Sequence, residues 1–276
     1  MTLDSGTRVL VRVDAGTVLG SSGETALIAL WDTGRVDAIV LGRSATGDAD
    51  PSAVAAFLGA RHPRLDLVIE AGFDHDFPYN LARRVASLQA LGGRAPALLL
   101  HPAGAGGDRD GVDALHRLWQ SWPRTSILGD RETRTFVDVE QLRRVDQAGR
   151  HRVAGPLQTP VDQDDLPVVL QHFDPAAPDE SADADVLVTD AAGAARAEAA
   201  DRRPVFIETA ASAVRLVVES GADGVIVDDE PDAVRRALDP LPRRGGGGLR
   251  GRWGLGRPRV TLDDGVRPFA PSRGHA

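Results

Sequence analysis

The sequence predicts a closed (β/α)₈ barrel of the TIM type over residues 1–240, followed by a Gly- and Arg-rich tail over residues 241–276. Two observations lead to this prediction. Eight short apolar runs alternate with helical stretches, as they do in α/β proteins with a parallel sheet. The runs also lack an alternation of polar and apolar residues, which indicates strands buried on both faces. Eight such units are the number that closes into a barrel.

The expected strands and helices follow one another in order along the chain. The strands occupy residues 8–13, 38–41, 65–69, 97–100, 168–171, 186–189, 205–207 and 224–227. The helices occupy residues 24–31, 52–60, 79–91, 112–119, 191–200 and 210–220. The connection between the fifth and sixth strands is too short for a full helix, so we expect a barrel trimmed at that point.

The helix expected at residues 79–91 has the clearest ends. Pro78 suits a first helical turn, because the N–H group that proline lacks would have had no partner there. Gly92 and Gly93 can adopt the left-handed conformation that ends a helix. An apolar stripe at helical spacing is predicted to face the core, formed by Leu81, Val85, Leu88 and Leu91.

Two segments depart from the repeating pattern. Residues 144–146 and 150–153, joined by a turn at 147–149, predict a β-hairpin inserted between the fourth and fifth barrel strands. The tail contains eight Arg and two Asp, so it is basic. It is expected either to be mobile or to fold back over the acidic barrel with Trp253 as its anchor.

Composition excludes several classes of function. The chain has no Cys, which rules out disulfides, thiolate metal sites and a cysteine nucleophile. Its net charge of −8 does not favour nucleic acid as a partner. No signal peptide or membrane-length apolar run is present, so we expect a soluble cytoplasmic protein with no membrane partner.

Several short motifs occur in a recognisable order. They include PYNLARR at residues 78–84, ASL at 86–88 and GGRA at 92–95, and then LWQSW at 118–122, GPL at 155–157 and PVVLQ at 167–171. From about Ile28 to Gly245 the chain resembles the luciferase-like flavin-dependent monooxygenases, in particular the nitrilotriacetate and dibenzothiophene-sulfone monooxygenases. The PYNLARR, ASL and GGRA motifs together make this resemblance specific.

The resemblance implies a barrel that uses reduced FMN, supplied by a separate flavin reductase, and O₂ to oxygenate a small organic substrate. It also allows a homo-oligomer or pairing with a related monooxygenase. The positions that correspond to flavin contacts in the family are occupied here by Arg43, Glu70, Leu98, Gln171 and Asp174. The family has an acid at the position of Arg43, an Asn at that of Leu98, a Thr/Ser-rich loop around Glu70, and a Gly/Ser turn where Gln171 to Asp174 lie. We therefore expect FMN to bind more weakly than in relatives, or not at all.

Charged and polar residues follow the expected strands at the end where barrel active sites lie. They are Asp14, Arg43, Glu70, His101, His172, Asp190, Glu208, Asp228 and Asp229. His75, His101 and His172 fall on loops of this end, and we take them as the candidate catalytic residues, for general acid–base chemistry near neutral pH. Carboxylates nearby would allow a metal site, but no HxH or HExxH spacing supports one, and none is predicted. A solvated rim with helix caps, such as Asp190, is the simplest explanation.

Three functions remain open from the sequence. The first is a luciferase-like FMN-dependent monooxygenase with impaired flavin binding. The second is a flavin-free, non-catalytic barrel that acts as a binding or assembly partner. The third is a barrel enzyme that uses His and Asp residues for acid–base or metal-dependent chemistry.

Overall fold

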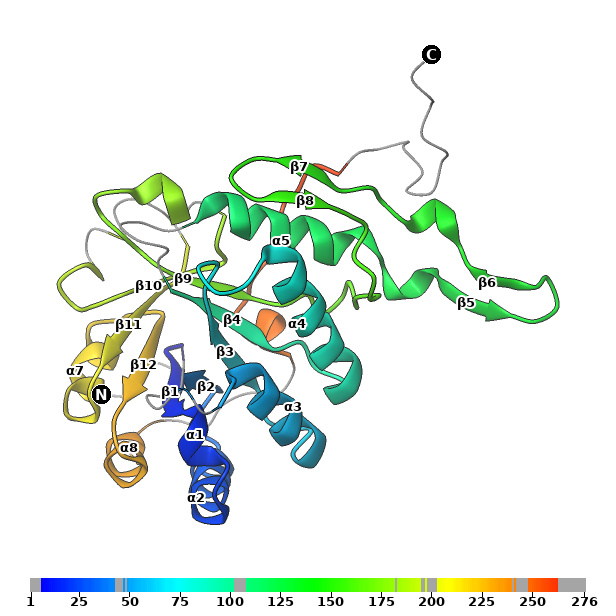
Figure 1. Cartoon of the computed structure of the whole chain (residues 1–276). Coiled ribbons are helices and arrows are strands. Elements are labelled where there is room, and N and C mark those ends of the chain that lie inside the picture. The colour runs from blue at the N-terminus through cyan, green and yellow to red at the C-terminus, as the bar shows by residue number, and fades with distance from the viewer. Residues whose placement is uncertain are drawn as a thin grey trace.

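Eight parallel strands close into a barrel in a computed structural model of the chain, which describes residues 6–42, 47, 49–101, 108–181, 183–194, 197, 203–239, 241 and 248–262 (Figure 1). The strands are β1 (Arg8–Asp14), β2 (Ala38–Gly42), β3 (Leu67–Ala71), β4 (Ala97–Leu100), β9 (Val169–His172), β10 (Val186–Thr189), β11 (Val205–Thr209) and β12 (Gly224–Asp228). Their order around the barrel follows the chain, and β1 pairs with both β2 and β12. The predicted barrel is confirmed, with each strand within two residues of its expected ends.

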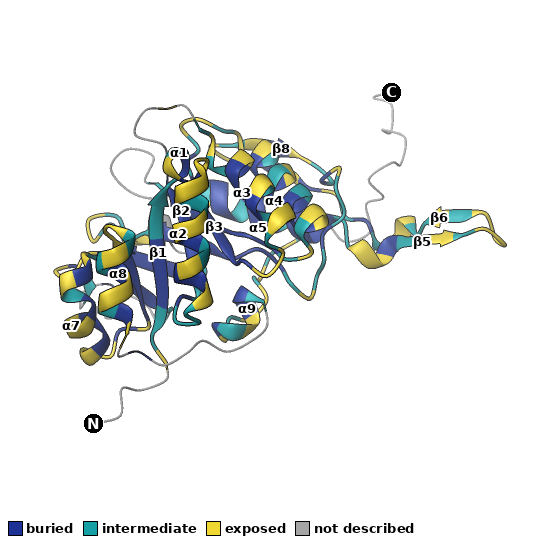
Figure 2. Cartoon of the chain, turned by 90° about the horizontal axis from the view of Figure 1, so that it is seen from below, coloured by how far each residue is buried: buried dark blue, intermediate teal, exposed yellow. Residues whose placement is uncertain are grey.

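Helices cover the outside of the barrel, with exposed outer faces over buried strands (Figure 2). They are α1 (Ala15–Val18), α2 (Ser21–Asp32), α3 (Pro51–Arg61), α4 (Pro78–Gly92), α5 (Arg109–Ser121), α7 (Val214–Glu219) and α8 (Pro231–Leu238). The sequence did not predict α1 and α8, and half of the residues of the helix expected at 191–200 lie outside the described residues. Between β9 and β10 the described residues form a single 3₁₀ turn, η3 (Pro178–Ser181), so the barrel is trimmed there as expected. Among the described residues, no helix has the length and apolar character needed to span a bilayer.

Helix α4 begins and ends as its sequence predicts. Pro78 occupies the first turn, and Gly93 ends the helix at φ 72°, in the left-handed region that favours glycine. Leu81, Val85 and Leu88 are buried against the barrel. Leu91 was expected in the same stripe, but its side chain is 74% exposed because it lies past the end of the buried face.

The described residues 108–168 between β4 and β9 include two hairpins. The predicted one forms from β7 (Asp146–Ala148) and β8 (Arg152–Ala154), with its turn two residues later than expected. A further hairpin, which the sequence did not predict, pairs β5 (Ile127–Asp130) with β6 (Thr135–Val137). It projects away from the barrel in both views (Figures 1 and 2).

The C-terminal segment closes the end of the barrel where the strands begin. Short helix α9 (Leu249–Arg252) is followed by Trp253, which is 3% exposed and meets the Phe206 ring edge-on at 5.1 Å between ring centroids. Arg250 pairs with Asp185 at 2.7 Å, and Arg252 pairs with Asp66 at 2.8 Å. Of the two alternatives for the tail, the described residues 248–262 therefore follow the folded-back one, with Trp253 as the anchor.

Candidate active site

The alternation of side chains along the barrel strands determines which residues face its interior. A layer of apolar side chains fills the interior below the mouth, formed by Leu10, Val40, Val68, Leu99, Leu170, Val188, Phe206 and Ile226. The position two residues further along each strand also faces inward, at the mouth of the barrel. These positions hold Arg12, Gly42, Glu70, His101, His172, Asp190, Glu208 and Asp228. Apart from Gly42, these residues form a ring of charged and polar side chains above an apolar floor.

Arg12 lies at the centre of this ring and links strands on both sides of it. Its Nε lies 2.6 Å from a Glu70 oxygen, and its Nη2 lies 2.5 Å from a Glu208 oxygen. Its Nη1 approaches Asp228 at 3.4 Å. Burial tends to lower the pKa of Arg12, but the Glu70 and Glu208 carboxylates outweigh that effect and raise the pKa. Arg12 therefore stays charged between the two glutamates.

Two histidines complete the ring on the opposite side. The Nε2 of His101 lies 3.3 Å from Glu70, and the Nε2 of His172 lies 3.8 Å from Glu208. The two imidazole rings are nearly parallel, 12° apart in plane, with centroids 6.0 Å apart. Burial lowers the pKa of His172, and the positive charge of Arg12 adds to that effect, whereas Glu208 opposes it. His172 is therefore neutral at pH 7, with one ring nitrogen able to accept a proton.

The structure brings together three of the predicted site residues: Glu70, His101 and His172. His75 does not join them, because its side chain is 58% exposed on the loop after β3, where it pairs with Asp74 at 2.9 Å. The inference that His75 shares one catalytic cluster with the other two histidines is therefore not supported by the geometry.

Two of the other predicted flavin contacts, Leu98 and Gln171, do not face the mouth. Leu98 is fully buried in the core between the sheet and the helices, because alternation gives the inward position on β4 to Leu99. Gln171 is likewise on the outward side of β9 and 1% exposed. Asp174 accepts a hydrogen bond from the Ala176 N–H at 2.8 Å and so shapes a turn. Leu98 and Gln171 therefore do not line the mouth, the role of Asp174 as a flavin contact stays a prediction, and Arg43 lies outside the described residues.

Sequence reasoning missed Arg12, the residue with the most ion pairs in the ring. Arg12 lies inside its strand, two residues before the strand ends, whereas the candidate catalytic residues all lie after the ends of the expected strands. A signal was present, since an arginine at an inward-facing position of a buried strand needs an acidic partner. Glu208 and Asp228 were noted at the strand ends, but their common partner was not.

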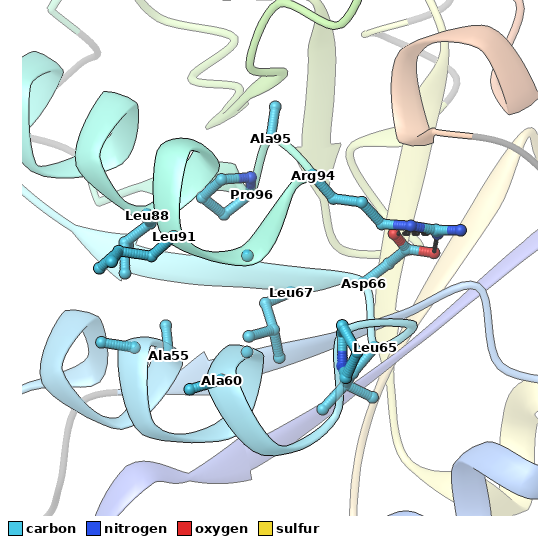
Figure 3. A pocket seen from close by; sticks show the side chains of 14 residues that line it. Ala55, Ala60, Leu65, Asp66, Leu67, Leu88, Leu91, Arg94, Ala95 and Pro96 are labelled. Carbon is cyan, nitrogen blue, oxygen red and sulfur yellow. Dashed lines mark hydrogen bonds and ion pairs between the residues drawn. The ribbon is translucent and has the colours of Figure 1, made fainter. Parts of the chain in front are cut away.

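A pocket of about 420 Å³ adjoins the mouth between β1, α2 and the start of α8. Arg12 forms part of its wall, Leu27 and Leu30 supply an apolar side, and Asp228 and Glu230 lie at its edge. A second, smaller groove lies between α3 and α4, next to the Asp66–Arg94 ion pair (Figure 3). Asp66 precedes β3, so this groove lies at the opposite end of the barrel from the candidate site.

A metal centre is not supported by the part of the chain that the structure describes. Within the described ranges, no group of three or more His, Asp or Glu side chains is arranged to hold a metal ion. The alternative of a metal site built from His75, His101 and His172 therefore lacks a structural basis.

Comparisons with known proteins show a related sequence and a related fold. No protein-family model matches the chain. Over 142 residues the chain is 28% identical to a dibenzothiophene-sulfone monooxygenase of Rhodococcus erythropolis, a match that covers 44% of this chain and 31% of the relative. The chain thus spans about a third of that relative's length. The EDTA monooxygenase of Chelativorans sp. BNC1 has the same fold, with a TM-score of 0.65 and 18% identity over 91% of this chain and 99% of that one.

The resemblance to the luciferase-like monooxygenases is confirmed. A riboflavin lyase whose structure contains a modified FMN and riboflavin also shares the fold, with a TM-score of 0.56 and 19% identity over 74% of this chain and 62% of that one. The barrel of this chain therefore shares its fold with these proteins, and its mouth is built around Arg12.

Proposed function

We propose that this chain is a luciferase-like monooxygenase that uses reduced FMN, delivered by a separate flavin reductase, and O₂ to oxygenate a small organic substrate. The match to dibenzothiophene-sulfone monooxygenase supports this proposal most strongly, because it agrees with the fold shared with EDTA monooxygenase. The ring of polar residues lies at the end of the barrel where active sites of this architecture lie.

The ring suits the uncharged edge of a flavin. An isoalloxazine edge carries both hydrogen-bond acceptors and an N–H donor, so it needs a mixed set of partners. Arg12 supplies donors, Glu70 and Glu208 supply acceptors, and the imidazoles of His101 and His172 can supply either. The apolar layer beneath them keeps water from the floor of the site.

The anionic groups of reduced FMN fit this ring less well. Arg12 already pairs with three carboxylates, and Asp228 is exposed at the rim. A phosphate close to one of these carboxylates would meet a repulsion on the order of a few kcal/mol at an effective dielectric constant near 20. The proposal therefore includes weak flavin binding, consistent with the replacement of hydroxyl and amide groups seen in the sequence.

The residues of the chain then have distinct roles. Bound reduced flavin supplies the electrons with which O₂ is activated. His172, neutral at pH 7, can accept a proton at its free ring nitrogen, and Glu208 lies close enough to stabilise the imidazolium that results. Arg12 positions Glu70 and Glu208 rather than contacting the reacting atoms.

The second candidate function is a flavin-free barrel that assists a related monooxygenase. One observation favours it. The charged groups at the centre of the mouth already pair with one another through Arg12, so they need no ligand to neutralise them. A preformed network of this kind would have to rearrange before a ring could bind against it.

Flavin titration distinguishes the two functions. We expect the purified chain to quench the fluorescence of oxidised FMN, and to bind reduced FMN in an anaerobic titration, with dissociation constants between about 10 µM and 1 mM, the range in which weak binding energies of about 4 to 7 kcal/mol fall. His172→Gln should weaken binding, whereas the matched change His75→Gln should not, since His75 is exposed outside the ring. Absence of binding up to about 1 mM would reject the monooxygenase and leave the assisting barrel.

A further inference from the structure

The pocket of about 420 Å³ beside the mouth shares two residues with the ring, Arg12 and Asp228. Helices α2 and α8 pack against each other on the outside of the barrel, and the pocket lies next to them at the mouth end of β1 and β12 (Figures 1 and 2). The volume of the pocket is within the range of small-molecule sites. A ligand in this pocket would therefore lie directly beside the ring.

One wall of the pocket is apolar and preformed. Leu27 and Leu30 lie on one face of α2 and are buried, and Val18 of α1 belongs to the same wall. Gly23 brings α2 close to α1, because a Cβ atom at this position would overlap the carbonyl oxygen of Thr17. Packing therefore fixes the wall, and an aliphatic group fits against it.

Another part of the lining is acidic, where β12 passes into α8. Asp228, Asp229 and Glu230 follow one another there. Asp229 holds the turn, since its carboxylate accepts hydrogen bonds from the N–H groups of Ala211 and Glu230 at 3.2 and 2.8 Å. The Glu230 side chain does not cap α8 and pairs with no cation among the described residues. Asp228, 64% exposed, meets Arg12 at 3.4 Å, so the carboxylates of Asp228 and Glu230 are both available to a ligand.

The charge of the lining favours a cation as the ligand. Its charged residues are one arginine and four acids, which gives a formal net charge of −3: Arg12, Asp14, Asp228, Asp229 and Glu230. Arg12 would repel a cation, but its guanidinium already lies 2.6 and 2.5 Å from carboxylate oxygens of Glu70 and Glu208. A cleft lined by one sign of charge concentrates ligands of the opposite sign. An anion of the same size would be repelled.

We propose that this pocket binds a small organic cation, an ammonium group joined to a short aliphatic chain, and that such cations are the substrate class of the protein. The ammonium group pairs with Asp228 and Glu230, and the aliphatic chain packs on Leu27 and Leu30. Within the described ranges no group of three or more His, Asp or Glu side chains is arranged for a metal ion, so an organic cation fits better than a metal. The role of the ligand as substrate rests on the proposed function, whereas its binding does not.

Isothermal titration calorimetry of the full chain without flavin tests the proposal, with hexylammonium and hexanoate as probes of equal chain length. We expect hexylammonium to bind with a Kd of about 1 mM or below, and hexanoate to bind at least about tenfold more weakly. The double variant Asp228→Asn, Glu230→Gln should weaken hexylammonium binding at least about tenfold. The matched control Glu219→Gln, Asp239→Asn removes two acids outside the pocket lining and should change the affinity less than about twofold. Equal affinities for the two probes, or equal effects of the two double variants, would overturn the proposal.

Filling the pocket gives a second test that leaves its charges in place. Ala26 lines the pocket, and Ala29 lies outside the lining on the same helix; both are exposed, so either position can accept a larger side chain. Ala26→Phe should raise the Kd for hexylammonium above about 10 mM, and the matched change Ala29→Phe should leave it unchanged. Hexylammonium binding that survives Ala26→Phe would show that the cation binds elsewhere and would overturn the proposal.

The two titrations, with amine and with FMN, separate this proposal from the proposed function. Hexylammonium binding by a chain that binds no FMN would reject the monooxygenase and support the assignment of the pocket to an organic cation. FMN binding by a chain that does not bind hexylammonium would overturn the assignment of the pocket alone.

Discussion

The two ends of the barrel hold their arginines in different ways. At the base, Arg250 bridges both oxygens of Asp185 and also donates to the backbone carbonyls of Leu166 and Pro167, with its side chain 7% exposed. At the mouth, the ion pairs of Arg12 go to carboxylates, and its side chain is 18% exposed. Backbone carbonyls cannot move without the strands, whereas carboxylates can rotate. The base is therefore a fixed closure, and the mouth is a network that a ligand can rearrange.

This difference predicts that stability depends more on the base than on the mouth. Trp253→Ala should have the largest effect, because it removes a buried indole packed on Phe206 and leaves a cavity at the barrel base. We expect a loss of about 3–5 kcal/mol in the free energy of unfolding, measured by urea titration. Trp253→Phe should recover much of that loss. A loss below about 1 kcal/mol for the alanine variant would mean that the closure does not contribute to the fold.

Arg250→Met should have the second-largest effect on the free energy of unfolding. It leaves Asp185 buried without its partner, at a cost of about 3 kcal/mol. The matched control Arg215→Met breaks an exposed i,i+4 pair with Glu219 and should cost about 0.5 kcal/mol or less. Equal effects of the two changes in urea unfolding would contradict the view of the base as a fixed closure.

Arg12→Met should cost less than Arg250→Met. Glu70 would remain buried beside His101, but Glu208 and Asp228 can turn toward water, so we expect about 1–2 kcal/mol. Urea unfolding of both variants under one set of conditions gives the comparison. A greater loss of unfolding free energy for Arg12→Met than for Arg250→Met would contradict the view that the base is the fixed end of the barrel and the mouth the adaptable one.

The pH dependence of stability should also differ between the ends. Burial lowers the pKa of both His116, near the base, and His172, at the mouth, while Asp185 and Glu208 respectively oppose the shift. A histidine whose folded pKa lies below its unfolded value of about 6.5 stabilises the fold above that pH, and this stability is lost as pH falls through the folded pKa. Each histidine that takes up a proton on unfolding adds at most about 1.4 kcal/mol per pH unit to the slope of the unfolding free energy against pH.

We therefore compare His116→Gln and His172→Gln by urea unfolding between pH 7.5 and 5. His116→Gln should flatten the pH dependence more, because His116 is 3% exposed while the His172 side chain is 21% exposed. A larger change for the mouth variant would show that the mouth is the less solvated end.

Local signals in the sequence were sufficient to predict the barrel strands and helix α4. They were not sufficient to predict the contacts that Arg12 and Trp253 make at the two ends of the barrel. The strands and helix α4 were predictable because apolar runs, Pro78 and Gly93 act over a few residues. Arg12 and Trp253 find their partners about 200 and 50 residues away in the chain, respectively, and no local pattern identifies such pairs. The hairpin of β5 and β6 was missed because its strands are only four and three residues long.

The family motifs predicted the fold more accurately than they predicted the residues of the site. Leu98 was placed at the flavin because of the motif position, although side-chain alternation on its strand turns it toward the helices. Applying the two-residue period to every strand would have selected Arg12, Glu70 and Glu208 as one layer. The two-residue period follows from strand geometry, whereas the packing alone shows which residues of each strand face inward.

The central claim is that carboxylates held by Arg12 determine how tightly the mouth binds flavin. The affinity of Glu208→Gln for FMN, measured against wild type by fluorescence titration, tests this claim most directly. Removing one negative charge while keeping the shape of the side chain should tighten FMN binding by about tenfold, or 1.4 kcal/mol, and should affect uncharged riboflavin less. Unchanged or weaker FMN binding by Glu208→Gln would contradict the account.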